Sequence, residues 1–265
     1  MSEVLGLPPA ALLAAAAAAL LVGVAKAGFG AGSGVIATPL VALTLPVPQA
    51  AALLLPVLIG ADIFAVWHYR RSASVRDLRL LLPSALVGIV LGALTFDLLA
   101  PHGRVLEVGI GILALVFVVW QGVRVQVLRA LVGHPPSRLW GGVLGGLAGF
   151  TSTLAHVGGP PVAVYLLPRG LGRELFVGTA AWFFFIVNVV KLVPYGLLGL
   201  LSVDNLLVAL LLLPLAYGGV ALGVWLNRTV RERGFTLAIY VLLTLTGIQL
   251  VTGGSLIGRL AHLHL

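Results

Sequence analysis

The chain has 265 residues, of which 60% are hydrophobic and only 9% are charged, and its mean hydropathy is +1.14. Soluble domains carry about 25% charged residues, so this composition excludes a soluble domain and predicts a polytopic membrane protein. The net charge of +8 does not indicate nucleic-acid binding, because Lys and Arg gather in the cytoplasmic loops of membrane proteins. The chain has no cysteine, which excludes disulfides, thiolate metal sites and a cysteine nucleophile.

The first apolar run covers residues 8–26 and is long enough for one membrane span of about 20 residues. We interpret it as a retained span rather than a cleaved signal peptide, since Glu3 and no basic residue precede it. A glycine-rich break follows, and the next apolar piece, residues 34–45, is too short to cross a bilayer. The further predicted spans and half-spans are residues 48–69, 80–99, 105–122, 139–150, 157–168, 174–198, 203–226 and 234–253.

One stretch of the chain occurs twice, at residues 26–39 and again at residues 147–161. Both copies contain Ala-Gly-Phe, and both reach a proline eleven residues after the glycine of that tripeptide. The alignment continues from residues 39–48 to residues 160–169. Each copy is a glycine-rich or hydroxyl-rich break where a continuous apolar helix would be expected. We interpret the two breaks as the functional centre of the protein.

Two later segments also match between the halves. Residues 74–78 resemble residues 202–206 at the start of the span that follows. At a constant offset of 131, one proline and two glycines match: Pro83, Gly88 and Gly92 against Pro214, Gly219 and Gly223. Internal repeats of this kind mark many transporter folds.

The arginine distribution predicts how the breaks cross the membrane. If each broken region passes in and back out, twelve arginines fall on one side and two on the other, whereas a single crossing of residues 139–168 gives eight against six. The positive-inside rule favours the first arrangement. It gives five passes per half, so the halves are inverted and both termini face away from the cytoplasm.

The predicted fold class is therefore an all-α polytopic membrane protein of two inverted repeats, each a broken helical hairpin plus three transmembrane helices. The first repeat covers residues 1–122, a cytoplasmic linker covers residues 123–138, and the second repeat covers residues 139–265. The predicted location is a bacterial-type inner membrane.

Four ionisable residues fall within spans or breaks, where charge is costly and often functional: Lys26, Asp62, His156 and Lys191. For each of these residues, and for the glycines of the breaks, a purely structural explanation stays open. Lys191 could snorkel to the interface, and Asp62 could only pair with a buried cation. His156 could bond a backbone carbonyl, and the glycines could only allow close helix packing.

The breaks also predict an anion site, because a helix that starts at membrane depth presents free N–H groups and a positive dipole end. Asn188 shares a helix face with Lys191. The candidate substrate-binding residues are Lys26, Gly28, Gly30, Gly32, Ser33, Gly34, Thr151, Ser152, Thr153, His156, Gly158, Gly159, Asn188 and Lys191. Asp62 is the candidate coupling residue. We predict no catalytic residue, no metal site and no cofactor.

These motifs resemble the signatures of the TauE/SafE sulfite exporter family. The resemblance rests on residues 28–34 with Pro39, on residues 149–161 continuing into Tyr165, and on Asn188 to Lys191 followed by Pro194 and Tyr195, within residues 10–253. It implies outward transport of a small sulfur-containing anion such as sulfite or an organosulfonate. The second break departs from the glycine-rich form of the motif.

Two other classes of function are weighed against this transporter. An intramembrane serine hydrolase would need Ser33 and His156 within hydrogen-bond reach, but the repeat puts them in different half-sites. A cation or metal transporter would need clustered oxygen or nitrogen ligands, and the spans offer one well-buried carboxylate. No nucleotide-binding loop is present, so the expected partners are the bilayer and the anion; proton coupling and a homodimer stay open.

Overall fold

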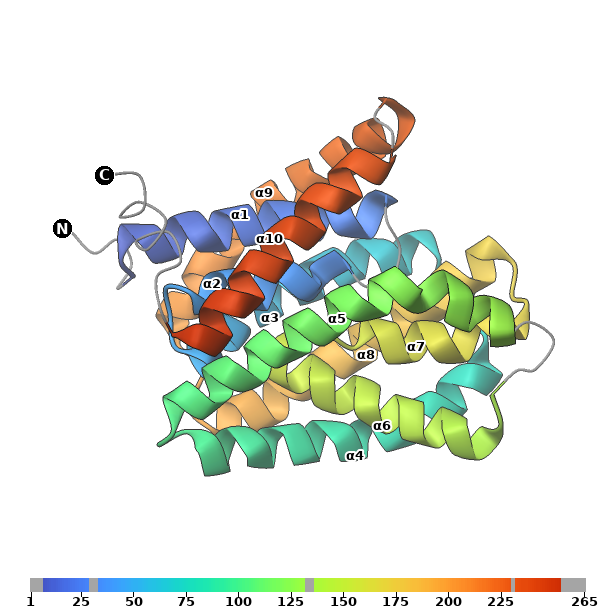
Figure 1. Cartoon of the computed structure of the whole chain (residues 1–265), viewed down its shortest axis with the longest axis horizontal. Helices are drawn as coiled ribbons and strands as arrows, with labels where there is room; N and C mark the ends of the chain where they lie inside the picture. The colour runs from blue at the N-terminus through green and yellow to red at the C-terminus, as the bar shows by residue number, and fades with distance from the viewer. Residues whose placement is uncertain (1–6, 29–32, 132–135, 230–231, 254–265) are drawn as a thin grey trace.

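A computed structural model describes residues 7–28, 33–131, 136–229 and 232–253. Within these ranges the chain is helical (Figure 1). The first half contains α1 (Pro9–Gly28), the 3₁₀ turn η1 (Ser33–Ile36), α2 (Ala37–Ala42), α3 (Val47–His68), α4 (Val75–Leu99) and α5 (Gly103–Leu131). The second half contains α6 (Arg138–Ala155), α7 (Gly159–Leu166), the 3₁₀ turn η2 (Leu167–Arg169), α8 (Arg173–Leu197), α9 (Val203–Thr229) and α10 (Glu232–Thr252).

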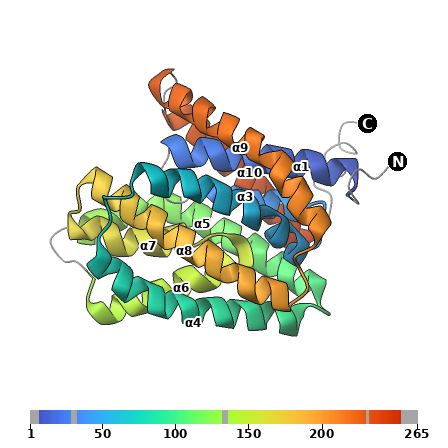
Figure 2. The ribbon, with the colours of Figure 1, turned by 180° about the vertical axis from the view of Figure 1, so that it is seen from behind.

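The two halves repeat one plan with opposite direction. Each begins with a helix, a break and a short returning helix, and each continues with three long helices. Corresponding helices, such as α3 and α8 or α4 and α9, run in opposite directions along the long axis (Figures 1 and 2). The predicted fold class of two inverted repeats is thus confirmed.

Five of the described helices are long and apolar enough to cross a membrane: α3, α4, the Gly103–Val127 part of α5, α8 and the Val203–Gly223 part of α9. Large apolar side chains such as Leu98 and Leu211 lie exposed on their outer faces. A bilayer would cover these faces, because lipid tails accept apolar side chains where water does not. The chain is a multi-pass membrane protein.

The main packing contacts join a helix of one half to a helix of the other. α1 packs along α9, and α6 packs along α4 (Figures 1 and 2). Glycines allow both contacts: a Cβ at Gly88 of α4 would lie 2.0 Å from the Gly146 carbonyl oxygen, and a Cβ at Gly219 of α9 would lie 2.3 Å from the Leu20 carbonyl oxygen. Gly88 and Gly219 were matched by sequence, so the repeat conserves a packing role.

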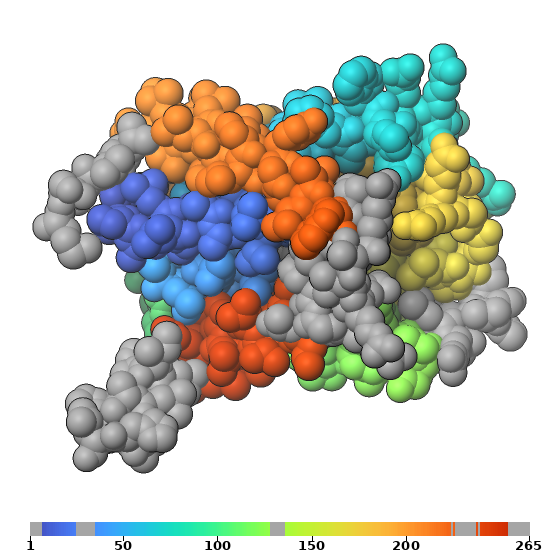
Figure 3. Space-filling model, turned by 90° about the horizontal axis from the view of Figure 1, so that it is seen from above, coloured from blue at the N-terminus to red at the C-terminus, as the bar shows by residue number. Residues whose placement is uncertain are grey.

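The arginine-rich segments gather at one end of the bundle, which we call the basic end. There α3 ends and α4 begins, α5 ends and α6 begins, and η2 leads into α8 (Figures 1 and 2). Seen from above, the end of α3 and the start of α8 lie side by side at this end (Figure 3). The start of α1 and the end of α10 lie at the opposite end (Figure 1).

At the basic end, two element boundaries differ from the predicted ones. α5 continues to Leu131, so residues 123–131 of the expected linker are helical. α4 begins at Val75 rather than near residue 80, because Ser74 caps the helix by accepting a hydrogen bond from the backbone N–H of Asp77. The polarity of these segments reflects their place at the basic end, where helices reach beyond the apolar layer.

Candidate functional site

The second break is shorter than the sequence predicts. Helix α6 continues through residues 151–153 and ends at Ala155, so only residues 156–158 separate it from α7. The expectation that the hydroxyl run belongs to the non-helical break is wrong. The hydroxyls of Thr151 and Thr153 donate to carbonyl oxygens four residues back, at 2.8 and 2.9 Å, a contact that keeps Ser and Thr within a helix.

His156 ends α6 in the left-handed conformation, with φ of 58°. Its Nδ1 lies 3.0 Å from the hydroxyl oxygen of Thr38, a fully buried residue of α2. This hydrogen bond therefore joins α2, the short helix after the first break, to the second break. Thr38 was not among the predicted site residues, because a lone Thr on an apolar half-helix carries no pattern of its own.

Lys191 lies at the centre of the site. Its side chain is fully buried, and its Nζ donates to the Ser152 carbonyl oxygen at 3.0 Å and to the Ser152 hydroxyl at 3.1 Å. The snorkelling alternative is therefore wrong. The last carbonyl groups of a helix lack intrahelical partners and carry the negative end of its dipole, so the C-terminus of α6 holds this ammonium group inside the protein.

Tyr195 donates from the same helix face one turn later. Its hydroxyl bonds the Thr153 carbonyl oxygen at 2.5 Å, and its ring is fully buried. Tyr195 thus completes the capping of α6 that Lys191 begins. The spacing of four from Lys191 on one helix was the available signal for this residue.

Asp62 and Asn188 extend the polar cluster to α3. The Asn188 amide donates to Asp62 Oδ2 at 2.6 Å, and the two side chains are 4% and 2% exposed, respectively. Asn188 precedes Lys191 by three residues and so lies on the same side of α8. The cluster therefore holds a buried cation and a buried carboxyl group on three packed helices, α3, α6 and α8.

The start of α7 offers fewer backbone donors than expected. Pro160 and Pro161 occupy its first turn, and proline has no N–H. Gly158 precedes them, and a Cβ there would lie 2.8 Å from the Ala148 carbonyl oxygen. Packing against α6 is thus sufficient to require glycine at position 158.

The first break is only partly described. Gly28 ends α1, and Ser33 and Gly34 begin η1. Gly30 and Gly32, together with the side chains of Lys26 and Ser33, lie outside the described part of the chain. Their assignment to the anion site stays a prediction.

Two repeats of opposite direction, each broken after its first helix, with buried charge beside the second break, are typical of a membrane transporter. Residues 15–250 match the family model described as sulfite exporter TauE/SafE. The match covers most of the chain, which therefore belongs to the TauE/SafE family. Comparisons with curated proteins and with solved structures give no match.

Proposed function

We propose that the protein is a secondary transporter that exports sulfite or a small organosulfonate across a bacterial-type inner membrane. The observation that carries the proposal is the buried ammonium group of Lys191, held at the end of α6 beside the second break. A fully buried cation is costly unless it is paired. The positive charge of this ammonium group attracts an anion that enters the site.

The neighbouring polar groups suit an oxyanion. Ser152 offers a hydroxyl that can turn from Lys191 towards a ligand. Asn188 Oδ1 is buried and accepts no hydrogen bond from the described residues, so it can accept one from a hydroxyl-bearing anion such as hydrogen sulfite. The carboxyl group of Asp62, which accepts a hydrogen bond from Asn188, disfavours a ligand with a second negative charge. These features favour a singly charged sulfonate or hydrogen sulfite over sulfate.

Anion-dependent thermal stabilisation of the purified protein tests this proposal. A ligand that binds only the folded state at about 100 times its Kd stabilises by about 2.7 kcal/mol, which raises Tm by several degrees. We expect stabilisation by hydrogen sulfite or by a singly charged organosulfonate at pH 7, and little by sulfate at equal ionic strength. Equal response to all anions would reduce the effect to general salt stabilisation and count against a selective site.

The predicted topology is testable by cysteine labelling, because the native chain has no cysteine. Ser137 caps α6 at the basic end, and Ser202 precedes α9 at the opposite end; both are exposed. We expect Ser137→Cys to react with an impermeant thiol reagent only from the cytoplasmic side and Ser202→Cys only from outside. Reaction of both from one side would contradict the proposed orientation with both termini outside.

A further inference from the structure

A buried network ties three elements together at the basic end. Asp77, in the first turn of α4, accepts hydrogen bonds from the Arg169 guanidinium at 3.1 Å and from the Tyr165 hydroxyl at 3.2 Å on one carboxylate oxygen. Its other oxygen accepts from the Ser74 hydroxyl at 2.6 Å. The side chain of Asp77 is 4% exposed and that of Arg169 is 20% exposed. The carboxylate therefore has a full set of partners in a site largely closed to water.

The network extends to α8, and two of its side chains, Arg169 and Tyr165, also contact each other. The Ser74 backbone N–H donates to the Thr179 hydroxyl at 2.8 Å, and Thr179 lies on α8. The Arg169 guanidinium also lies 4.5 Å from the centre of the Tyr165 ring, in a cation–π contact. Tyr165 belongs to α7 and Arg169 to η2, so the network fastens the returning half-helix to α4 and α8.

The segment of α7 and η2 lies between the Lys191 site and the network. Helix α6 is fixed on α4, since a Cβ at Gly149 would lie 2.1 Å from the Ala85 carbonyl oxygen. The segment itself is bounded by Gly158 before α7 and by Gly170 after η2, where φ is 65°. Its first end lies beside Ser152, where a Cβ at Gly158 would be 3.1 Å from the Ser152 Cβ, and its other end lies at the network, so one short helix connects the two.

At the opposite end of the bundle, the described residues form no equivalent network. By the sequence repeat, Thr44, Pro48 and Asn205 correspond to Tyr165, Arg169 and Asp77. None of the three is charged. The Thr44 hydroxyl donates to the local Val41 carbonyl oxygen at 2.9 Å.

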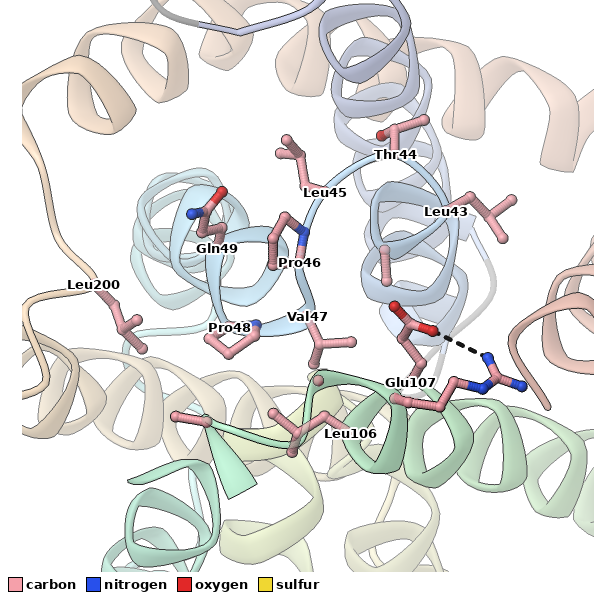
Figure 4. A pocket seen from close by; sticks show the side chains of 14 residues that line it. Leu43, Thr44, Leu45, Pro46, Val47, Pro48, Gln49, Leu106, Glu107 and Leu200 are labelled. Atoms are coloured by element: carbon pink, nitrogen blue, oxygen red, sulfur yellow. Dashed lines mark hydrogen bonds and ion pairs between the residues drawn. The ribbon is translucent and has the colours of Figure 1, made fainter. Parts of the chain in front are cut away.

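A cavity of about 590 Å³ opens at that end, lined by residues 42–49 with Leu106, Glu107 and Leu200 (Figure 4). A cavity of similar size, about 540 Å³, opens at the basic end, where Trp67, His68 and Glu174 are among its lining residues. In the described part of the chain the two ends differ instead in how charge is paired: Asp77 and Arg169 form a largely buried pair between α4 and η2, whereas Arg104 and Glu107 form an exposed pair within α5.

We propose that Asp77, Tyr165 and Arg169 form the gate that closes the transport pathway at the basic end. The gate rests on the proposed transport function in one respect, since a transporter must open at each end in turn. Opening separates Arg169 and Tyr165 from Asp77 and swings α7 and η2 about the bounding glycines.

The test measures access to the site from each side of the membrane, and it needs no substrate. The reporter is Ser152→Cys, a buried position beside Lys191, labelled by a small impermeant thiol reagent in oriented vesicles. In this background Arg169→Gln should speed labelling from the basic side at least about tenfold, the factor that loss of about 1.4 kcal/mol of closure free energy gives. The matched control, Glu107→Gln, breaks the exposed 3.0 Å pair with Arg104 at the opposite end and should leave basic-side labelling unchanged.

Tyr165→Phe keeps the test decisive if Arg169→Gln fails to fold, because it removes one hydrogen bond to Asp77 and leaves every charge in place. It should speed basic-side labelling by a smaller factor. Unchanged basic-side labelling in the folded gate variants overturns the gate, whatever the protein transports. Accelerated labelling in a protein that moves no sulfur anion keeps the gate and overturns only the substrate.

Discussion

Lys191→Gln should abolish sulfite transport while the protein still reaches the membrane. Glutamine keeps a donor for the Ser152 carbonyl oxygen, which Lys191 bonds at 3.0 Å, so the C-terminus of α6 stays capped. The positive charge is lost. A hydrogen bond to a charged group contributes about 1.5–3 kcal/mol, so anion affinity should fall by roughly tenfold to a hundredfold or more.

The readouts are sulfite flux in proteoliposomes and anion-dependent Tm of the purified variant. The matched control is Arg173→Gln, which removes a positive charge from an exposed position of the same helix. It should keep both flux and anion stabilisation. If Lys191→Gln retains wild-type anion stabilisation, Lys191 serves only to cap α6 and the anion binds elsewhere.

Gly219→Val should cause the largest loss of stability among single substitutions on α9, and Gly218→Val should cause almost none. A Cβ at Gly219 would lie 2.3 Å from the Leu20 backbone oxygen of α1, whereas a Cβ at Gly218 would meet nothing within 4 Å. A backbone oxygen cannot rotate away as a side chain can. Overpacking of this kind costs about 1–3 kcal/mol, and here we expect the upper part of that range.

Thermal unfolding of both variants in the same detergent measures the difference. At roughly 2–4 °C per kcal/mol for a chain of this size class, Gly219→Val should lower Tm by several degrees relative to Gly218→Val. Equal Tm values for the two neighbours would contradict the close contact between α1 and α9. Both variants carry the same substitution on the same helix, so the effects of helix propensity and of added apolar surface cancel in the difference between their Tm values.

Much of the fold could be predicted because matching prolines and glycines recur in the two halves at a fixed sequence offset. Gly88 and Gly219 correspond in sequence and pack alike, each against the first helix of the other half. The charge asymmetry correctly indicated that both broken regions turn back, since a hairpin returns its basic flank to the side from which it came. Boundaries were harder: the length of the second break depended on hydroxyls that bond their own helix, which composition does not reveal.

The sequence predicted the charged and amide residues of the site, but it did not reveal several of the residues that contact each other across the fold. Lys191, Asn188 and Asp62 stood out because ionisable and amide groups are rare in apolar spans. Thr38 and the network of Asp77 with Arg169 did not, since their importance arises from contacts between residues more than 90 positions apart. Arg169 in particular had the appearance of one more arginine at the cytoplasmic boundary.

Flux of labelled sulfite from proteoliposomes, compared with thiosulfate, sulfoacetate, sulfate and a divalent metal ion, tests the central claim most directly. We expect wild-type protein to raise the flux of sulfite or an organosulfonate well above that of protein-free vesicles and of the Lys191→Gln variant, and to carry no metal ion. Metal-ion flux without any anion flux, or sulfite flux that Lys191→Gln leaves unchanged, would contradict anion transport at the Lys191 site.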